Sequence, residues 1–160
     1  MKSIPKGLLG IVALALLGAG PWTAANAADD PATIVVKRQA LMKQQGAMAK
    51  AINEYVESGA GEPADVLRYA MTFRAISLAI PDLFPAGTSM DDGVGKTGAK
   101  PAIWADWAGF QAAAAKFGEE GGKLADAALT GDKAKIAEQF ASFGKNGCGG
   151  CHTPFRQKLE

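Results

Sequence analysis

The chain has 160 residues, enough for one domain with its own core, and its 17 Lys and Arg residues nearly balance its 16 Asp and Glu residues. Such a balance argues against a nucleic-acid-binding protein and against strong attraction to an anionic membrane surface. We therefore expect no nucleic-acid partner.

Residues 1–27 are predicted to be a secretory signal peptide. Two lysines near the start precede a short apolar segment, Leu8 to Leu17, and Ala25-Asn26-Ala27 is a small-x-small cleavage site. The apolar segment is shorter than the roughly 20 residues that a membrane-spanning helix needs, and no other segment is a candidate. We expect a periplasmic mature protein, residues 28–160, with no membrane span, in which 15 basic residues oppose 16 acidic ones.

Two amphipathic helices are predicted at the start of the mature chain. The first covers residues 31–58, beginning at a proline and ending before a glycine-rich turn. Its inward stripe, with a repeat of seven residues, consists of Val35, Met42, Ala49, Ile52 and Val56. The second covers residues 63–80, has one apolar face at helical spacing, and is stopped by a proline.

The second half of the chain is predicted to be helical as well. Residues 82–100 form a turn-rich loop that is long for a compact bundle, which we interpret as a crossover connection. A third helix is expected from about Pro101 to Leu129, weakened locally by Gly118 and by Gly121-Gly122. A fourth helix follows the break at Gly131-Asp132. Because no stretch alternates with period two, we predict an all-α fold, an antiparallel four-helix bundle.

The most informative stretch is Cys148-Gly149-Gly150-Cys151-His152, close to the C-terminus. Cys-x-x-Cys-His is the attachment pattern of a c-type haem, in which the thiols bond to the porphyrin vinyl groups and the imidazole is an axial iron ligand. Residues three and four apart share one face of a helix, so Cys148, Cys151 and His152 can face the same macrocycle.

Three other interpretations use the same residues. A redox dithiol is expected in a βαβ context, which the sequence lacks. A zinc site needs more ligands than two cysteines and one histidine, which are all that the chain contains. A structural disulfide leaves the histidine unexplained. We therefore predict one covalently attached haem c.

Four stretches together carry a family resemblance. They are Arg38-Gln39-Ala40-Leu41-Met42-Lys43, Leu83-Phe84-Pro85-Ala86-Gly87-Thr88, Pro101-Ala102-Ile103-Trp104, and Cys148 to His152 followed by Phe155-Arg156. With these residues the chain resembles the cytochrome c prime family, the class II c-type cytochromes, over the whole of residues 28–160. The resemblance implies a four-helix bundle that carries its haem near the C-terminus.

Within that family, the position four residues after the first-helix arginine faces the distal side of the iron. A non-ligating residue there, often leucine, leaves the iron five-coordinate in the high-spin branch, whereas a methionine ligates it in the low-spin branch. Here the position is Met42. The resemblance therefore implies axial ligation by His152 and Met42, as in the low-spin cytochrome c-556 branch. The alternative for Met42 is a core-filling role.

The resemblance also implies contacts around the haem edge. It places Arg38 and Gln39 there, where a guanidinium can pair with a propionate. The alternative for Arg38 is a side chain that points outward from its helix. Arg156, one turn after His152, would shield the proximal face or contact a propionate, and the alternative is a solvated terminal charge.

We expect the protein to be a one-electron carrier that exchanges electrons with periplasmic redox proteins and transforms no substrate, and hence not an enzyme. The alternative is a five-coordinate protein that binds nitric oxide or carbon monoxide. A haem-free thiol protein is a third possibility, which the placement of the single histidine disfavours. The sequence is compatible with a monomer or a homodimer.

Overall fold

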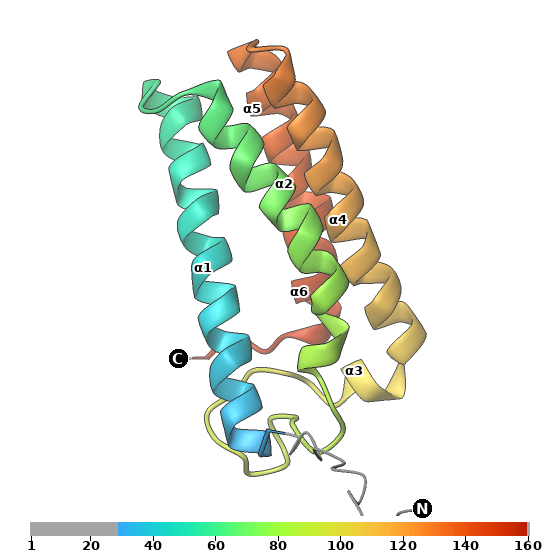
Figure 1. The fold of residues 1–160 in the computed structure, drawn as a ribbon. Coiled ribbons are helices and arrows are strands. Elements are labelled where there is room, and N and C mark those ends of the chain that lie inside the picture. Colours follow the sequence, from blue (N-terminus) through green and yellow to red (C-terminus); the bar gives the residue numbers. More distant parts are fainter. Residues whose placement is uncertain (1–28, 160) are drawn as a thin grey trace, which may run out of the picture.

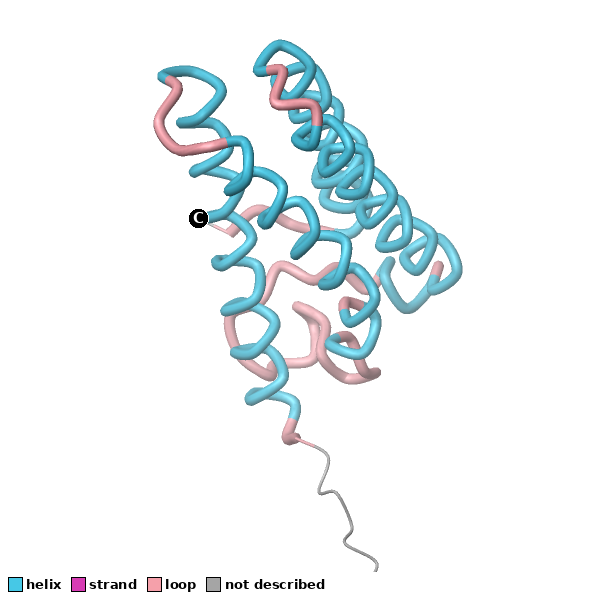
Figure 2. Tube along the Cα trace, turned by 45° about the horizontal axis from the view of Figure 1, so that its top comes forward, coloured by secondary structure: helices cyan, strands magenta, loops and turns pink. Residues whose placement is uncertain are grey.

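The computed structural model describes residues 29–159, so the predicted signal peptide, residues 1–27, lies outside the described part. The α-helices are α1 (Pro31–Ser58), α2 (Pro63–Ala79), α3 (Ala102–Ala105), α4 (Trp107–Leu129), α5 (Lys133–Ser142) and α6 (Gly149–Phe155). A 3-10 turn, Pro81–Leu83, follows α2, and a π-helical segment, Phe143–Cys148, joins α5 to α6. Helices and loops make up the described residues, without a strand (Figure 2).

Four long rods stand side by side: α1, α2, α4, and the continuous run of α5, the π-helical segment and α6 (Figure 1). The predicted all-α four-helix bundle is confirmed. Helix α2 packs mainly on α4, whereas α1 contacts α2 and α5. Over residues 29–159, no helix combines the length and the apolar character needed to cross a bilayer.

The first helix begins and ends where the sequence predicted. At its start, the Asp30 carboxylate accepts a hydrogen bond of 3.0 Å from the Thr33 amide, which satisfies one of the free N–H groups of the first turn. At its end, Gly59 has a φ of 78° and donates to the Tyr55 carbonyl, a left-handed cap that suits glycine. The predicted inward stripe is only partly correct, because Met42 is half-buried, lining a cavity rather than the packed core.

The predicted weakness of the third helix at its glycines is not found, since α4 is continuous over residues 107–129. Gly118 and Gly121 instead face α2 at close range. A methyl group at Gly118 would lie 2.9 Å from Ser77 Cβ, and one at Gly121 would lie 3.2 Å from the Arg74 backbone nitrogen. Because these two glycines have no side chain, α2 and α4 can approach each other closely.

The third helix does, however, break where we expected continuity. At Asp106 the backbone leaves the helical region, with φ −124° and ψ 62°, and its carboxylate accepts a hydrogen bond of 3.0 Å from the Gly109 amide. This residue ends the short α3 and caps α4, which changes the direction of the chain (Figure 1).

The last rod contains a feature that we did not predict, the π-helical segment before the cysteines. A π-turn holds one more residue than an α-turn, so it rotates the following residues about the helix axis. The Phe143 ring stacks on Phe73, with centroids 4.8 Å apart, and lies 5.2 Å from the Phe117 ring. The wide turn therefore begins at a tightly packed aromatic contact.

The long loop after α2 is held to the C-terminal tail. The Gln157 amide donates to the Gly98 carbonyl at 2.7 Å, and the Lys100 amide donates to the Phe155 carbonyl at 3.1 Å. Ala99 and Arg156 form an isolated antiparallel bridge between the same segments. Loop and tail thus close one end of the bundle together.

Candidate haem site

A cavity of about 640 Å³ separates α1 from α6. Its wall is mostly apolar and includes the rings of Phe73, Phe84, Phe110, Phe117 and Phe155. The loop and the C-terminal tail border it at one end. A cavity of this size with an apolar wall is typical of a cofactor site.

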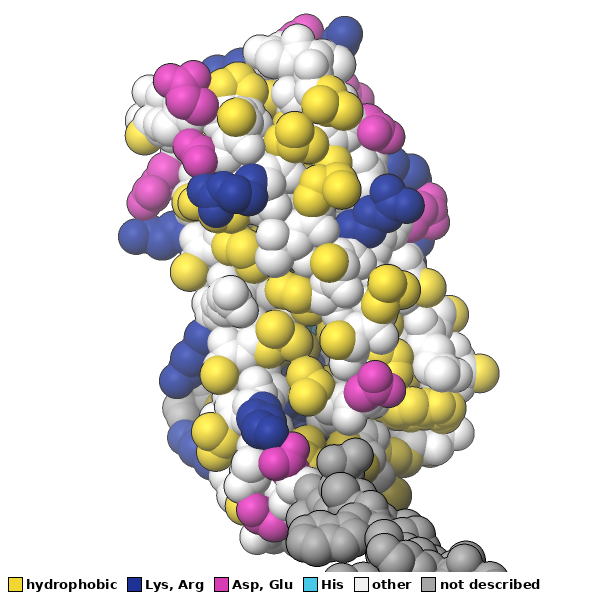
Figure 3. Space-filling view, in the orientation of Figure 1, with side chains coloured by type: hydrophobic (Ala, Val, Ile, Leu, Met, Phe, Trp, Pro, Cys, Tyr) yellow, Lys and Arg dark blue, Asp and Glu magenta, His cyan; other side chains and the backbone are white. Residues whose placement is uncertain are grey.

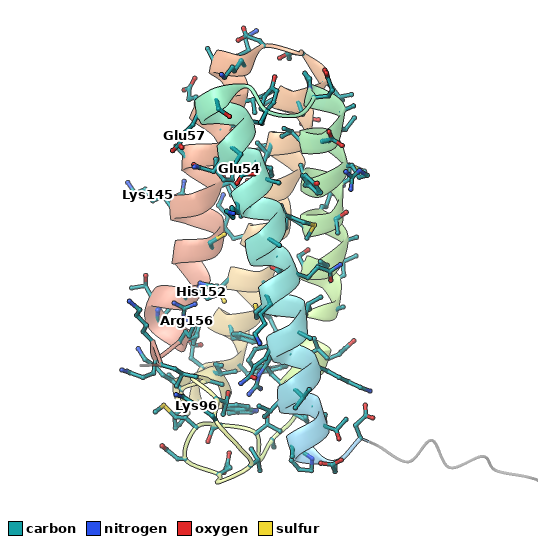
Figure 4. All side chains as sticks on the ribbon, turned by 90° about the vertical axis from the view of Figure 1, so that its left-hand side faces the viewer. Glu54, Glu57, Lys96, Lys145, His152 and Arg156 are labelled. Atoms are coloured by element: carbon teal, nitrogen blue, oxygen red, sulfur yellow. The ribbon has the colours of Figure 1, made fainter. Side chains whose placement is uncertain are left out.

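All seven residues predicted for the site line this one cavity. Helix α1 contributes Arg38, Gln39 and Met42, and the C-terminal run contributes Cys148, Cys151, His152 and Arg156. Residues more than 100 positions apart in the sequence are thereby brought together. Figure 4 shows His152 and Arg156 at neighbouring heights on the side of the bundle that carries α1.

The two thiols are half-buried and unbridged. Burial raises the pKa of Cys148, and burial together with the neighbouring Cys148 raises the pKa of Cys151 to about 11. Both sulfurs are therefore neutral thiols at neutral pH. A redox dithiol needs a lowered thiol pKa, so these surroundings argue against that interpretation.

The His152 imidazole is also half-buried, on the same helix as Cys151. Burial lowers its pKa, and the positive charge of Arg156 lowers it further. The ring is consequently neutral at neutral pH, which is the form that binds a metal.

Met42 lies on the α1 wall of the cavity, one turn after Arg38. Its side chain is half-buried, and the sulfur accepts a hydrogen bond of 3.7 Å from the side-chain Nε2 of Gln45. Met42 packs against the hydrophobic core and also borders the cavity.

Arg38 is buried, with only 3% of its surface exposed. One terminal nitrogen donates to the Thr97 hydroxyl at 2.7 Å and to the Thr88 carbonyl at 2.9 Å, and the guanidinium lies 4.4 Å from the centre of the Phe84 ring. Burial lowers its pKa to about 10, so the group stays charged at neutral pH. The outward-pointing alternative for Arg38 is therefore wrong, because the loop binds the side chain inside the fold.

Within residues 29–159, no carboxylate forms an ion pair with Arg38. A buried cation that lacks a carboxylate of its own chain suits a bound group that brings negative charge. Gln39, beside it, donates to the Lys96 carbonyl and so fastens α1 to the loop.

Sequence reasoning missed the residues that hold Arg38. Thr88 and Thr97 are almost fully buried, at 0% and 6% exposure, and both belong to the long loop. Thr88 ends a stretch that carried the family resemblance, so a signal existed for it. Thr97 stands in a run of glycine, lysine and threonine that has no distinctive pattern.

The donor set identifies the kind of group that fits. Two thiols, one imidazole and one thioether surround an apolar volume that has a buried cation at its edge. Within residues 29–159, no cluster of three or more His, Cys, Asp or Glu side chains could hold a bare metal ion. The cavity suits a large apolar macrocycle that contains a metal and carries carboxylates.

The family model for cytochrome c' matches residues 33–156 of the chain. The chain belongs to the cytochrome c' family. Members of this family bind covalent haem c, and the two cysteines near the C-terminus fit its attachment.

The chain is similar to relatives named cytochrome c' and to relatives named cytochrome c-556. Cytochrome c' of Rhodospirillum rubrum is 34% identical over 143 residues, which cover 89% of this chain and 95% of the relative. Cytochrome c-556 of Agrobacterium tumefaciens strain B2A is 34% identical over 125 residues, which cover 78% of this chain and 97% of the relative.

Solved cytochrome c' structures share the fold. One of them is a cytochrome c' with an unusual ligand-controlled dimer dissociation. Its TM-score is 0.74 at 26% sequence identity, and the match covers 82% of this chain and all of that chain. A nitric oxide complex of a point mutant of cytochrome c prime from Alcaligenes xylosoxidans has a TM-score of 0.68 at 26% identity, and covers 81% of this chain and 97% of that one.

Proposed function

We propose that this cytochrome c' family member is a periplasmic one-electron carrier. In this proposal one haem c is attached through Cys148 and Cys151, with His152 and Met42 as its two axial ligands. The observation that carries the proposal is that Met42 on α1 and His152 on α6 line the same cavity from separate elements. Bound haem c supplies an iron centre that changes its charge by one electron.

The residues of the chain have separate tasks in this proposal. The two thiols give covalent attachment, so that the cofactor cannot leave a small bundle. A neutral His152 and the soft sulfur of Met42 are donors suited to haem iron, and His/Met ligation raises the reduction potential. Ligation that is the same in both oxidation states keeps structural change small, as an electron carrier requires.

Arg38 has a supporting task in the same proposal. Its guanidinium is held by the loop, buried, and without a carboxylate partner in the described chain. We assign it to a haem propionate, because a charge-assisted hydrogen bond would offset the charge that the fold buries. Gln39 and Arg156 line the same cavity and are assigned to the haem edge.

The alternative function is binding of a small gas such as nitric oxide at a five-coordinate iron. One observation favours it: the Met42 sulfur already has a partner within the chain, the side-chain amide of Gln45, whose hydrogen bond takes one of the two lone pairs of the sulfur. The nitric oxide complex of the A. xylosoxidans protein belongs to that class of function.

The visible spectrum of the mature holoprotein tests the two functions. If Met42 is a ligand, the ferric protein is low-spin and has a weak charge-transfer band near the red end of the visible spectrum. Met42→Leu keeps side-chain volume, so its packing penalty stays below about 1.5 kcal/mol. The variant loses the sulfur donor and becomes high-spin, binds carbon monoxide faster, and has a lower potential.

Met48→Leu is the matched control, because Met48 is buried on the same helix and does not line the cavity. This variant should keep the parent spectrum. A parent that is high-spin, or a Met42→Leu variant that remains low-spin, would contradict the ligand assignment. The first of these results would make gas binding the leading function.

Two measurements test attachment and export. Extraction with acidic acetone should leave the haem on the polypeptide, and Cys148→Ser or Cys151→Ser should reduce the yield of holoprotein because one thioether is lost. Mass spectrometry of the periplasmic protein should give an N-terminus at Ala28 and the added mass of one haem. Colour in the organic phase, or an intact N-terminus in the membrane fraction, would refute the corresponding part.

A further inference from the structure

The charged residues that line the cavity are all basic. They are Arg38, Lys43, Lys96, Arg156 and Lys158, and no Asp or Glu within residues 29–159 joins them. The mature chain has 15 basic and 16 acidic residues, so a third of its basic side chains line this one cavity. The chain is nearly neutral as a whole, but its charge is unevenly distributed.

Four of these side chains are exposed, and we call them the basic rim: Lys43, Lys96, Arg156 and Lys158. They come from three separate segments, namely α1, the long loop and the C-terminal tail, which meet around the cavity. Arg38 is excluded from the rim because it is buried.

Several basic side chains outside the rim are held in ion pairs, although within residues 29–159 Arg74, Lys100, Lys133 and Lys145 are not. Lys37, Lys50, Lys116 and Lys123 each lie within 3.3 Å of a carboxylate. Lys43, Arg156 and Lys158, in contrast, form no ion pair with any residue of the described chain. Their charges are therefore not compensated by close carboxylates and act outward on the solvent.

The labelled residues show where the rim lies along the bundle. In Figure 4, Arg156 lies next to His152 and Lys96 lies further toward the lower end, whereas Glu54, Glu57 and Lys145 lie in the upper half. Figure 3 shows Lys and Arg side chains along the left-hand edge in the lower half, whereas acidic and basic side chains are mixed at the upper left. The charged side chains around the cavity are thus of one sign.

We propose that the basic rim docks an acidic electron-transfer protein, whose own cofactor is surrounded by Asp and Glu side chains. This inference depends on the proposed carrier function and adds the chemistry of its partner. A complementary charged patch steers encounter and raises association rates by about 10- to 1,000-fold at low salt. Because the net charge is close to zero, such steering has to come from the asymmetry of the surface.

The arrangement of the rim favours a protein over a small anion. Its charges come from three segments and surround an opening, whereas a small-anion site gathers its donors around one point. Two haem propionates would offset at most two positive charges, and the buried Arg38 already provides one of them. Gln39, Gln45 and Gln157 add uncharged polar side chains to the lining, as expected of a small interface that forms and separates quickly.

The test uses an acidic flavodoxin as the probe protein and the mature holoprotein as its partner. Electron transfer is followed by stopped flow from about 10 mM to about 500 mM salt, where screening removes steering. Binding is measured independently, from amide chemical shifts in a titration. We expect the rate to fall as salt rises, and the shifted amides to cluster at the rim.

A matched pair of double variants locates the effect. Lys43→Glu with Lys158→Glu reverses two rim charges, and Lys133→Glu with Lys135→Glu makes the same change in net charge at the start of α5, away from the cavity. At low salt the rim variant should lose at least about tenfold in rate, and the control variant should stay within about twofold of the parent.

Several results would overturn the proposal. One is a rate that does not depend on salt, and another is an equal loss in both variants, which would make net charge the cause. Binding of the parent, but not of the rim variant, to vesicles containing phosphatidylglycerol without any binding to flavodoxin would assign the rim to a membrane. A high-spin holoprotein contradicts the carrier function instead, and is detected separately from its ferric spectrum.

Discussion

Two glycines of α4, four residues apart, should respond in opposite directions to the same substitution. Gly118 lies closer to α2 than Gly122 does: a methyl group at Gly118 would lie 2.9 Å from Ser77 Cβ, whereas at Gly122 the nearest atom is Cδ of the flexible Arg74 side chain, 3.8 Å away. Replacing glycine by alanine inside a helix stabilises it by about 1 kcal/mol. Overpacking costs about 1–3 kcal/mol.

The two terms predict the sign of each variant. Gly122→Ala should raise the free energy of unfolding by about 1 kcal/mol, since only the helix term applies. Gly118→Ala should lower it by about 0–2 kcal/mol, because Ser77 has to move and its hydroxyl is held by a hydrogen bond of 2.7 Å to the Arg74 carbonyl. The free energies of unfolding of the two variants should therefore differ by about 1–3 kcal/mol. Each kcal/mol corresponds to about 3–5 °C of melting temperature in a domain of this size.

Thermal and urea unfolding of the ferric holoprotein, followed by far-ultraviolet circular dichroism, measures both values. A Ser77→Gly background provides an internal check, because it removes the side chain that Gly118→Ala meets. In that background Gly118→Ala should become stabilising. Equal stability of the Gly118→Ala and Gly122→Ala proteins would refute the conclusion that glycine is required for the approach of α2 and α4.

Two further predictions concern buried polar groups. Glu120 is 2% exposed, and its pKa is lowered from 4.5 to about 2, chiefly by the hydrogen bond from Lys123. The stabilising effect of the charged Glu120 carboxylate is complete above pH 4.5 and is lost as the pH falls toward 2. In acid-unfolding experiments, the stability advantage of the parent over Glu120→Gln should therefore shrink between these two pH values. A difference that stays constant over this range would contradict the prediction. Thr97→Val removes the hydroxyl that accepts hydrogen bonds from Arg38 and from the Ala99 amide. The variant should lower the free energy of unfolding by about 1–3 kcal/mol and speed amide hydrogen exchange in residues 84–100. Unchanged exchange would show that other contacts hold the loop.

Local signals predicted the parts of the fold that local interactions determine. The first helix was correct at both ends because Pro31 and Gly59 act through their own backbone preferences. The break at Asp106 has such a signal too, since aspartate is a common N-cap, but the apolar stripe on both sides of it favours one continuous helix. The π-helical segment depends on the packing of Phe143 against Phe73, which lies 70 positions earlier in the chain.

In the candidate site, too, some residues are indicated by local sequence and others depend on distant parts of the chain. Cys148, Cys151 and His152 could be read from one short motif, whereas the burial of Arg38 depends on acceptors 45 to 59 residues away. In the sequence, Glu120 stands beside Glu119 and close to Lys116 and Lys123, which gives no signal of burial. It is buried because Gln139 and Ser142, 19 and 22 residues later, donate to its second oxygen. Periodicity cannot indicate such partners, since it describes one helix at a time.

The position of the tryptophans gives this protein a built-in optical reporter. Trp22 falls in the predicted signal peptide, which leaves Trp104 and Trp107 in the mature chain. The Trp104 indole donates to the Phe84 carbonyl at 3.0 Å, and the Trp107 ring lies 5.5 Å from that of Phe110. Phe84 and Phe110 both line the cavity, so each indole is one side chain away from it. Haem absorbs where indole emits and quenches a neighbouring tryptophan by energy transfer. The folded holoprotein should therefore be almost dark, and its emission should grow as the bundle opens, which allows unfolding to be followed without a label.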